Sequence, residues 1–271
     1  MALTIAHTPD VDDAFMFYAM SSRKITLPFE LDHVIEDIET LNKMAFEAKL
    51  DVTAISAHAY AYLHEKYRIL SAGASVGDGY GPIVVANKKI EFQGKKIAIP
   101  GKYTTASLLL SLAVDDFEPV EMKFDEIIPA VKRGDVDAGL LIHEGQITYE
   151  MHGLVKILDL WEWWYDKTSL PLPLGLNVIR RDIPEEQQRA FLKAMRASID
   201  YALRNTDEAI EYAMKYSRGL EKELAKKFAL MYVNDYTYEM PESVVRGLEA
   251  LYSMAEERGL FKKPPLDILY L

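Results

Sequence analysis

Short apolar segments alternate with amphipathic segments along the first half of the chain, which is the pattern of strands alternating with helices. The first block predicts strands at 3–6, 29–35 and 52–55 and helices at 12–20, 38–48 and 56–67. The second block predicts strands at 96–100, 120–124 and 136–142 and helices at 105–114 and 127–133. Strand, helix and strand in this order indicate parallel pairing. We therefore expect two α/β lobes.

A segment rich in glycine and proline, 73–82, separates the first block from an apolar strand at 83–86. Another strand is predicted at 176–179, and the pattern is then helical to the end. The first of these late helices has an apolar face at helical spacing, made by Phe191, Leu192, Met195, Ile199 and Leu203. We expect these C-terminal helices to pack back on the first lobe. The expected lobes are therefore 1–87 plus 176–271 and 88–175, with a cleft and two hinge crossings between them.

The apolar run from Val136 to Ile142 ends abruptly at His143. A run this short and branched fits a strand that is covered on both faces, and ligands of α/β sheets bind at the carboxyl ends of such strands. An imidazole there can exchange a proton near neutral pH. The alternative is that His143 only hydrogen-bonds the backbone of a turn, and position alone leaves both open.

Other predicted strand-to-helix turns carry hydroxyls or acids. Thr104 and Thr105 open a helix whose free N–H groups suit a carboxylate or a phosphate, although simple N-capping explains them as well. Ser56 opens a helix in the other lobe and has the same two interpretations. Asp12 and Asp13 suit a helix start, and one of them could instead face a ligand. A calcium loop is disfavoured because its glycine and distal acid are missing.

Composition narrows the class of protein. The 271 residues are 49% hydrophobic, enough for a full core. Lys and Arg total 31 against 42 Asp and Glu, a net charge of -11 without a basic block, so nucleic acid is not an expected partner. There are no cysteines, which excludes disulfides, thiolate nucleophiles and zinc–cysteine sites. No apolar window reaches a membrane span and no leader pattern opens the sequence, so we expect a cytoplasmic protein without an obligate protein partner.

Several blocks of this sequence resemble the 1,4-dihydroxy-6-naphthoate synthase family of the futalosine route to menaquinone. They are Thr8-Pro9-Asp10-Val-Asp12-Asp13-Ala-Phe15, Glu36-Asp37-Ile-Glu39-Thr40-Leu-Asn42, Gly101-Lys-Tyr-Thr104-Thr105-Ala106 and Gly139-Leu-Leu-Ile-His143-Glu144. The resemblance extends over nearly the whole chain. One departure lies in the first block, where many members carry Ser-Pro-Cys-Pro-Asn-Asp-Thr.

The resemblance implies a two-lobed fold like that of the type II periplasmic binding proteins. It implies a lyase that converts cyclic dehypoxanthine futalosine, a small-molecule carboxylate, to 1,4-dihydroxy-6-naphthoate without a redox cofactor or a metal. His143 aligns with the proton acceptor of the family. The aligned substrate-binding positions are Ala54, Ile55, Ser56, Thr105 and Ala106, with Thr8, Pro9, Asp12 and Thr104 as further expected cleft residues.

Two other functions remain open from the sequence. Chorismate dehydratase is a sister family with the same fold and pathway, and the block Ile142-His143-Glu144 argues against it. A solute-binding protein with the same lobes is the alternative outside enzymes. The aromatic residues at 161–165 suit core or interlobe packing better than a stacking platform.

Overall fold

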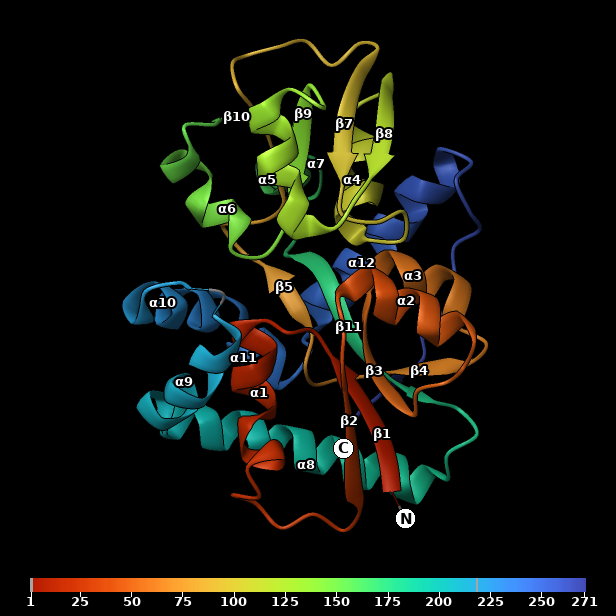
Figure 1. Cartoon of the computed structure of the whole chain (residues 1–271). Coiled ribbons are helices and arrows are strands. Elements are labelled where there is room, and N and C mark those ends of the chain that lie inside the picture. The colour runs from red at the N-terminus through yellow and green to blue at the C-terminus, as the bar shows by residue number, and fades with distance from the viewer. Residues whose placement is uncertain (1, 218) are drawn as a thin grey trace.

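The computed structural model describes residues 2–217 and 219–271 and contains two β-sheets, one in each lobe (Figure 1). The first sheet has the strand order β12-β4-β11-β3-β1-β2, and β5 also pairs with β11. Its strands are β1 (Ala2–His7), β2 (Glu30–Ile35), β3 (Val52–Ser56), β4 (Tyr67–Leu70), β5 (Ser75–Gly77), β11 (Leu172–Arg180) and β12 (Ile268–Leu269). The predicted α/β fold with two sheets is confirmed.

The second sheet has the order β10-β6-β9-β7-β8. Its strands are β6 (Ile83–Ala86), β7 (Lys95–Ile99), β8 (Phe117–Glu121), β9 (Ala138–Leu141) and β10 (Val155–Asp159). Parallel pairing holds within each block, where β1 pairs with β2 and β3, and β7 pairs with β8 and β9. In contrast, β11 runs antiparallel to β3, and β6 runs antiparallel to β9. These two strands enter their sheets from the other lobe, so no helical crossover sets their direction.

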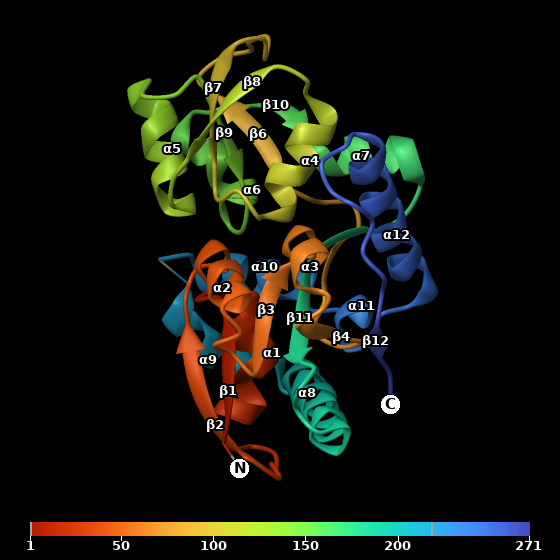
Figure 2. The ribbon, with the colours of Figure 1, turned by 90° about the vertical axis from the view of Figure 1, so that its right-hand side faces the viewer.

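The helices cover the faces of the two sheets (Figure 2). In the first block they are α1 (Val11–Ser21), α2 (Ile38–Phe46) and α3 (Ala57–Leu63). In the second they are α4 (Thr105–Ala113), α5 (Phe124–Arg133), α6 (Gly145–Thr148) and α7 (Leu160–Thr168). The C-terminal part has α8 (Glu185–Arg204), α9 (Thr206–Ala213), α10 (Lys222–Tyr232), α11 (Asp235–Tyr238) and α12 (Glu242–Glu257). Short 3-10 segments lie at Tyr149–His152 and Met214–Tyr216.

The helix expected at 56–67 is shorter than the sequence pattern predicts. It ends at Leu63, because Tyr67–Leu70 forms β4 and pairs with β11. That pairing partner lies more than a hundred residues further along the chain, so a local pattern cannot indicate it.

Helices α8, α9 and α10 pack around α1, as the apolar face of the first late helix predicts. Phe191 and Met195 of α8 are fully buried in the same cluster as Phe15 and Phe17 of α1. The hydroxyl of Ser198 donates to the carbonyl of Met16 at 2.7 Å. The C-terminal helices therefore stabilise the first lobe.

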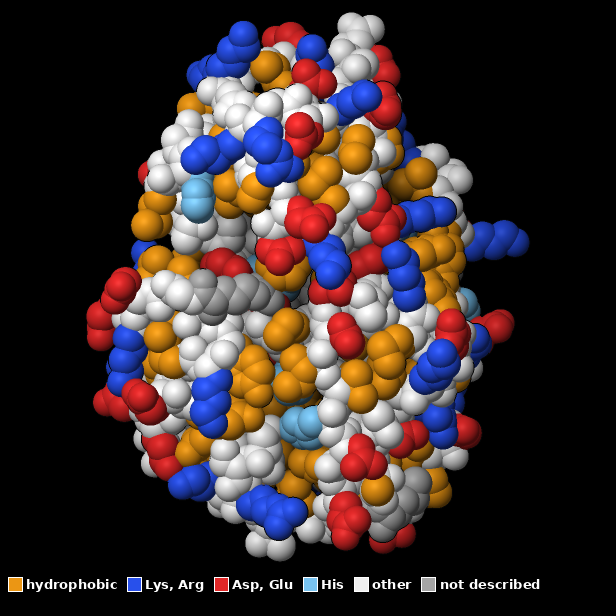
Figure 3. Space-filling model, viewed as in Figure 1, with side chains coloured by type: hydrophobic (Ala, Val, Ile, Leu, Met, Phe, Trp, Pro, Cys, Tyr) orange, Lys and Arg blue, Asp and Glu red, His pale blue; other side chains and the backbone are white. Residues whose placement is uncertain are grey.

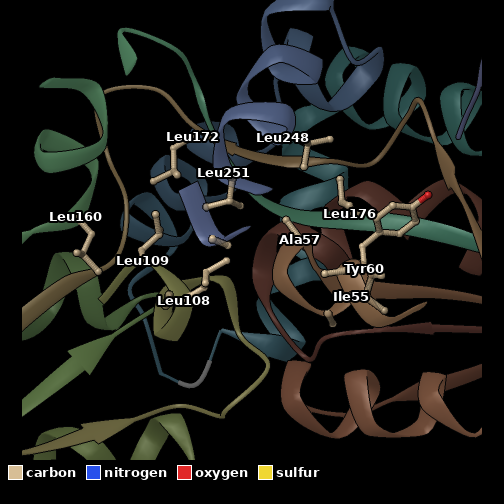
Figure 4. Close-up of a cluster of buried hydrophobic side chains, with 14 of the residues drawn as sticks. Ile55, Ala57, Tyr60, Leu108, Leu109, Leu160, Leu172, Leu176, Leu248 and Leu251 are labelled. Carbon is tan, nitrogen blue, oxygen red and sulfur yellow. The ribbon is translucent and has the colours of Figure 1, made fainter. Parts of the chain in front are cut away.

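Helix α12 lies against both lobes rather than the first alone. It contacts β11 of the first sheet and α4 of the second lobe. Figure 4 shows Leu251 of α12 between the Leu108–Leu109 side of the cluster and the side that carries Ala57. One continuous apolar cluster therefore joins the two lobes behind the cleft.

Strand pairing corrects the placement of two short segments. β6 pairs with β9 and β10 in the second sheet, whereas the expected limit at residue 87 puts it in the first lobe. β11 already begins at Leu172, so residues 172–175 pair with the first sheet. The glycine-rich segment before β6 supplies the crossing. The lobe limits remain a prediction, and the pairing favours limits near residues 82 and 171.

Charged side chains of both signs lie side by side on the face shown in Figure 3. Within the residues that the structure describes, no helix has the length and apolar character needed to cross a bilayer.

Candidate active site

A pocket lies between the two lobes, at the level where β3, β11 and the start of α4 meet. It encloses about 680 Å³, including the open space at its mouth. The first lobe contributes strand and turn residues, among them Ala54, Ser56 and Asn177. The second lobe contributes the start of α4 and His143 with Gln146. The pocket is thus built by both lobes.

Most of the residues predicted as a site line this one pocket. They are His143, Ala54, Ile55, Ser56, Thr105, Ala106, Thr8, Asp12 and Thr104. Pro9 is not among the lining residues, because the turn directs Thr8 and Asp12 to the pocket on either side of it. Their roles in binding and catalysis remain proposals.

His143 follows β9, which ends at Leu141, one residue earlier than the expected strand. Its backbone is left-handed, with φ 53°, a conformation that costs a non-glycine residue free energy and that is concentrated at functional sites. The ring meets the edge of Phe124 at a centroid distance of 5.0 Å. His143 therefore leaves the strand in a strained turn that directs its ring to the cleft.

The imidazole of His143 has a carboxylate partner from the other lobe. Its Nδ1 lies 3.0 Å from Oδ2 of Asp10, and Asp10 is almost fully buried. Glu144, the neighbour in sequence, instead lines a separate hollow beside α5. Because Nδ1 faces the carboxylate of Asp10, Nε2 is the ring nitrogen that could meet a ligand.

The turn that carries Asp10 is closed by its own residues. Oδ2 of Asp13 accepts hydrogen bonds from the backbone N–H and the hydroxyl of Thr8, both at 2.7 Å. Burial raises the pKa of Asp13, and its neighbour Asp10 raises it further, although His7 and the Thr8 bonds act the other way. Asp13 therefore stabilises the helix start, as one of its predicted roles requires.

Asp12 lines the pocket with one carboxyl oxygen buried. Burial, and then the charges of Asp13 and Asp10, raise its pKa well above the usual value. Burial likewise raises the pKa of Tyr232, which also lines the pocket. Each shift favours the neutral form of its group, and the hydroxyl of Tyr232 donates its proton to the side-chain oxygen of Gln146.

The hydroxyls at the start of α4 fit both of their predicted roles, which are N-capping of the helix and a place in a ligand site. Thr104 caps the helix by accepting from the N–H of Ser107 at 3.2 Å. The hydroxyl of Thr105 donates to the carbonyl of Leu174 at 2.6 Å and accepts from the N–H of His58 at 3.2 Å. The N–H groups of Thr105 and Ala106 belong to the first turn, where no intrahelical carbonyl serves them. These two N–H groups are the candidates for an anionic ligand.

Ser56 is held by a residue that the sequence analysis did not single out. The side-chain oxygen of Asn42 accepts from the backbone N–H of Ser56 at 2.9 Å, and its amide nitrogen donates to the Ser56 hydroxyl at 3.1 Å. Ser56 makes no side-chain cap to α3. Asn42 ends the second block that carries the family resemblance, and this was the available signal.

Gln146 and Tyr232 are two further pocket residues that the sequence did not predict. With its amide oriented to satisfy all neighbours, Gln146 donates to the carbonyl of Gly81 at 2.6 Å. Its oxygen accepts from the Tyr232 hydroxyl at 2.9 Å and from the N–H of His143 at 3.2 Å. Tyr232 is the last residue of α10, which packs on α1 and β5 of the first lobe, so its bond to Gln146 joins the two lobes.

The aromatic segment at 161–165 belongs to the core and its edge, which confirms the packing interpretation. Trp164 is fully buried, and its indole N–H donates to the carbonyl of Leu170 at 2.8 Å. Trp161 stacks on Tyr165 with a centroid distance of 5.1 Å. Over residues 2–217 and 219–271, no group of three or more His, Asp or Glu side chains is arranged to hold a metal ion.

The fold and the interlobe pocket together define a two-lobed α/β protein like the type II periplasmic binding proteins. The ligand-binding component of an ABC-type import system from Staphylococcus aureus superposes with a TM-score of 0.74 at 14% identity, over 100% of this chain and 96% of that one. The alkanesulfonate-binding protein from Xanthomonas axonopodis superposes at 0.71 with 13% identity, over 99% and 98% of the two chains. At this identity the likeness shows the fold alone.

The chain belongs to the family described as menaquinone biosynthesis, whose model matches residues 3–257. It is 40% identical to the 1,4-dihydroxy-6-naphthoate synthase of Thermus thermophilus over 97% of both chains. It is 33% identical to the enzyme of the same name from Streptomyces coelicolor, over 95% of this chain and 94% of that one. A crystal structure from Archaeoglobus fulgidus matches at 67% identity and a TM-score of 0.95, over 96% and 98% of the chains. The resemblance seen in the sequence is confirmed.

Proposed function

We propose that this protein is a 1,4-dihydroxy-6-naphthoate synthase in which His143 is the general base. The activity rests on the two relatives of that name, each aligned over nearly the whole chain. The observation that carries the role of His143 is its place in the interlobe pocket, with Nδ1 3.0 Å from Oδ2 of Asp10. The expected substrate is cyclic dehypoxanthine futalosine.

The chemistry follows from what the pocket residues can do. Nε2 of His143 takes the proton of a sugar hydroxyl, the oxygen becomes a carbonyl, and the neighbouring C–C bond breaks. The electron pair of that bond moves through the fused ring onto a ring carbonyl oxygen, which takes the proton back from His143 to become a hydroxyl, and formation of the aromatic naphthoate favours the products. The sugar-derived fragment leaves as the carbonyl compound, so no oxidant or reductant is consumed.

The rest of the pocket suits the other end of this substrate. The first-turn N–H groups of Thr105 and Ala106, both pocket residues, donate to its carboxylate, and the helix dipole favours a negative charge there. Asp12 in its neutral form can donate a hydrogen bond to a carbonyl oxygen on which charge develops. A cytoplasmic location fits this proposal, because the family is one of biosynthesis.

Incubation of the purified protein with cyclic dehypoxanthine futalosine, followed by chromatography, tests the activity. We expect release of 1,4-dihydroxy-6-naphthoate. Turnover of chorismate instead would assign the protein to the sister dehydratase family. Binding of either compound without any turnover would favour a solute-binding protein.

The role of His143 is tested by His143→Ala, which should still bind substrate but lose about 10²–10⁴-fold in kcat. His64→Ala is the matched control, because His64 lies at the end of α3, with Nδ1 3.1 Å from the carbonyl of Ala61, outside the pocket lining. If His143→Ala keeps a kcat near that of His64→Ala, another group is the base.

A further inference from the structure

Asp10 and His143 reach each other from opposite lobes. Asp10 lies between β1 and α1 of the first lobe, and His143 follows β9 of the second. The distance from Oδ2 to Nδ1 is 3.0 Å, and the exposed fractions of the two side chains are 2% and 17%. A contact this short therefore exists only while the lobes are together.

Each partner is fixed within its own lobe. The bonds from Thr8 to Asp13, both 2.7 Å, hold the turn that carries Asp10. On the other side, Phe124 packs against the imidazole, and the side-chain oxygen of Gln146 accepts from the backbone N–H of His143. The relative position of carboxylate and imidazole is thus set by lobe closure rather than by flexible side chains.

We propose that Asp10 is the positioning residue of His143 and completes the base only when the lobes close. An ionised carboxylate can only accept hydrogen bonds, so a carboxylate oxygen 3.0 Å from Nδ1 favours the tautomer that carries its proton on that nitrogen. The lone pair is then on Nε2, the nitrogen that takes the proton of the substrate hydroxyl. The same negative charge stabilises the imidazolium that forms once the proton is taken.

This inference rests on the proposed role of His143, and its first test is kinetic. Asp10→Asn keeps the size of the side chain, but its amide N–H can face Nδ1 and favour the other tautomer. We expect a loss of about 10²–10⁴-fold in kcat, as for a base in the wrong tautomer, with KM changed less than about threefold. Asp10→Glu should recover part of the rate, because it restores a carboxylate.

Asp51→Asn is the matched control for loss of a shielded carboxylate in the first lobe. Asp51 accepts from the N–H of Thr4 at 2.9 Å and pairs with Arg180, far from the pocket lining. Its removal should cost stability without a tenfold fall in kcat. An equal fall in both variants would mean that Asp10 acts only through stability and would overturn the inference.

The second test does not depend on turnover. ¹⁵N-histidine spectra of the protein saturated with 1,4-dihydroxy-6-naphthoate report which ring nitrogen carries the proton, and His143→Gln identifies the signal. We expect Nδ1–H in the wild type and in Asp10→Glu, and a shift toward Nε2–H in Asp10→Asn. An unchanged tautomer together with an unchanged kcat in Asp10→Asn overturns the inference. If His143→Ala stays active, the proposed function of His143 fails, whereas the spectra still decide whether Asp10 positions the ring.

Discussion

The backbone N–H of His58 donates a hydrogen bond to the hydroxyl of Thr105 at 3.2 Å, and this bond joins the first turn of α3 to the first turn of α4. The two helices belong to different lobes, and in Figure 2 they lie on the sides of the lobes that face each other. The same hydroxyl donates to Leu174, so one side chain satisfies a donor of the first lobe and an acceptor on β11. The two helix starts thus bind each other as well as line the pocket.

Replacement of Thr105 with valine should destabilise the protein, because it keeps the shape and removes the hydroxyl. The N–H of His58 and the carbonyl of Leu174 then lose a partner, at about 1–3 kcal/mol for each buried group. Urea unfolding measures the loss, and Thr105→Ser should restore most of it. Thr206→Val is the control, because its hydroxyl donates to the carbonyl of Leu203 within the same part of the chain, at 2.9 Å. Equal unfolding free energies in Thr105→Val and Thr206→Val would contradict the bridging role.

Gly101 of the second lobe lies directly against the side chain of Glu39 in the first lobe. A Cβ built there would lie 2.5 Å from Cγ and 2.6 Å from Cβ of Glu39 on α2. Gly101→Ala should therefore hold the lobes apart and raise KM by about tenfold or more, equivalent to about 1.4 kcal/mol. Gly94→Ala controls for backbone strain, because Gly94 also has a positive φ but nothing within 4 Å of the added atom.

Steady-state kinetics and small-angle scattering with bound product check this expectation together. The scattering should show a larger radius of gyration for Gly101→Ala than for Gly94→Ala. If both variants close and bind alike, the contact with Glu39 does not limit closure.

His58 makes stability depend on pH. Burial lowers its pKa from 6.5 to about 4, although Nδ1 lies 3.2 Å from the carbonyl of Thr104. A depressed pKa means that the unfolded chain binds more protons between about pH 4 and 6.5. The contribution is therefore fully present above pH 6.5 and is lost as the pH falls to about 4, a change of about 3 kcal/mol.

Urea unfolding at pH 7 and pH 4 measures this change in the wild type and in His58→Asn. The variant should lose about 3 kcal/mol less between the two pH values, because its amide does not titrate. His33, whose pKa burial also lowers to about 4, is present in both proteins and cancels in the difference. A parallel pH dependence of the two proteins would show that His58 is protonated in the folded state.

The amino-acid sequence by itself determined the two α/β blocks, the C-terminal helices and the turns that carry the candidate site. Periodicity indicates which face of a segment is buried, so the ends of β1, α1 and β9 could be predicted to within two residues. Thr104 could be placed at a helix start because capping is a local interaction. His143 could be placed at the end of a strand because the apolar run before it is also a local pattern. The family resemblance then added its expected role.

Only the tertiary structure decided which side chains meet. β6 joined the second sheet and β4 replaced the end of a predicted helix, because their partners are distant in sequence. The partner of His143 is Asp10 rather than the adjacent Glu144, since the direction of each side chain depends on the turn and on how the lobes pack. A local pattern specifies burial, whereas a contact across the cleft depends on the free energy of closing two lobes.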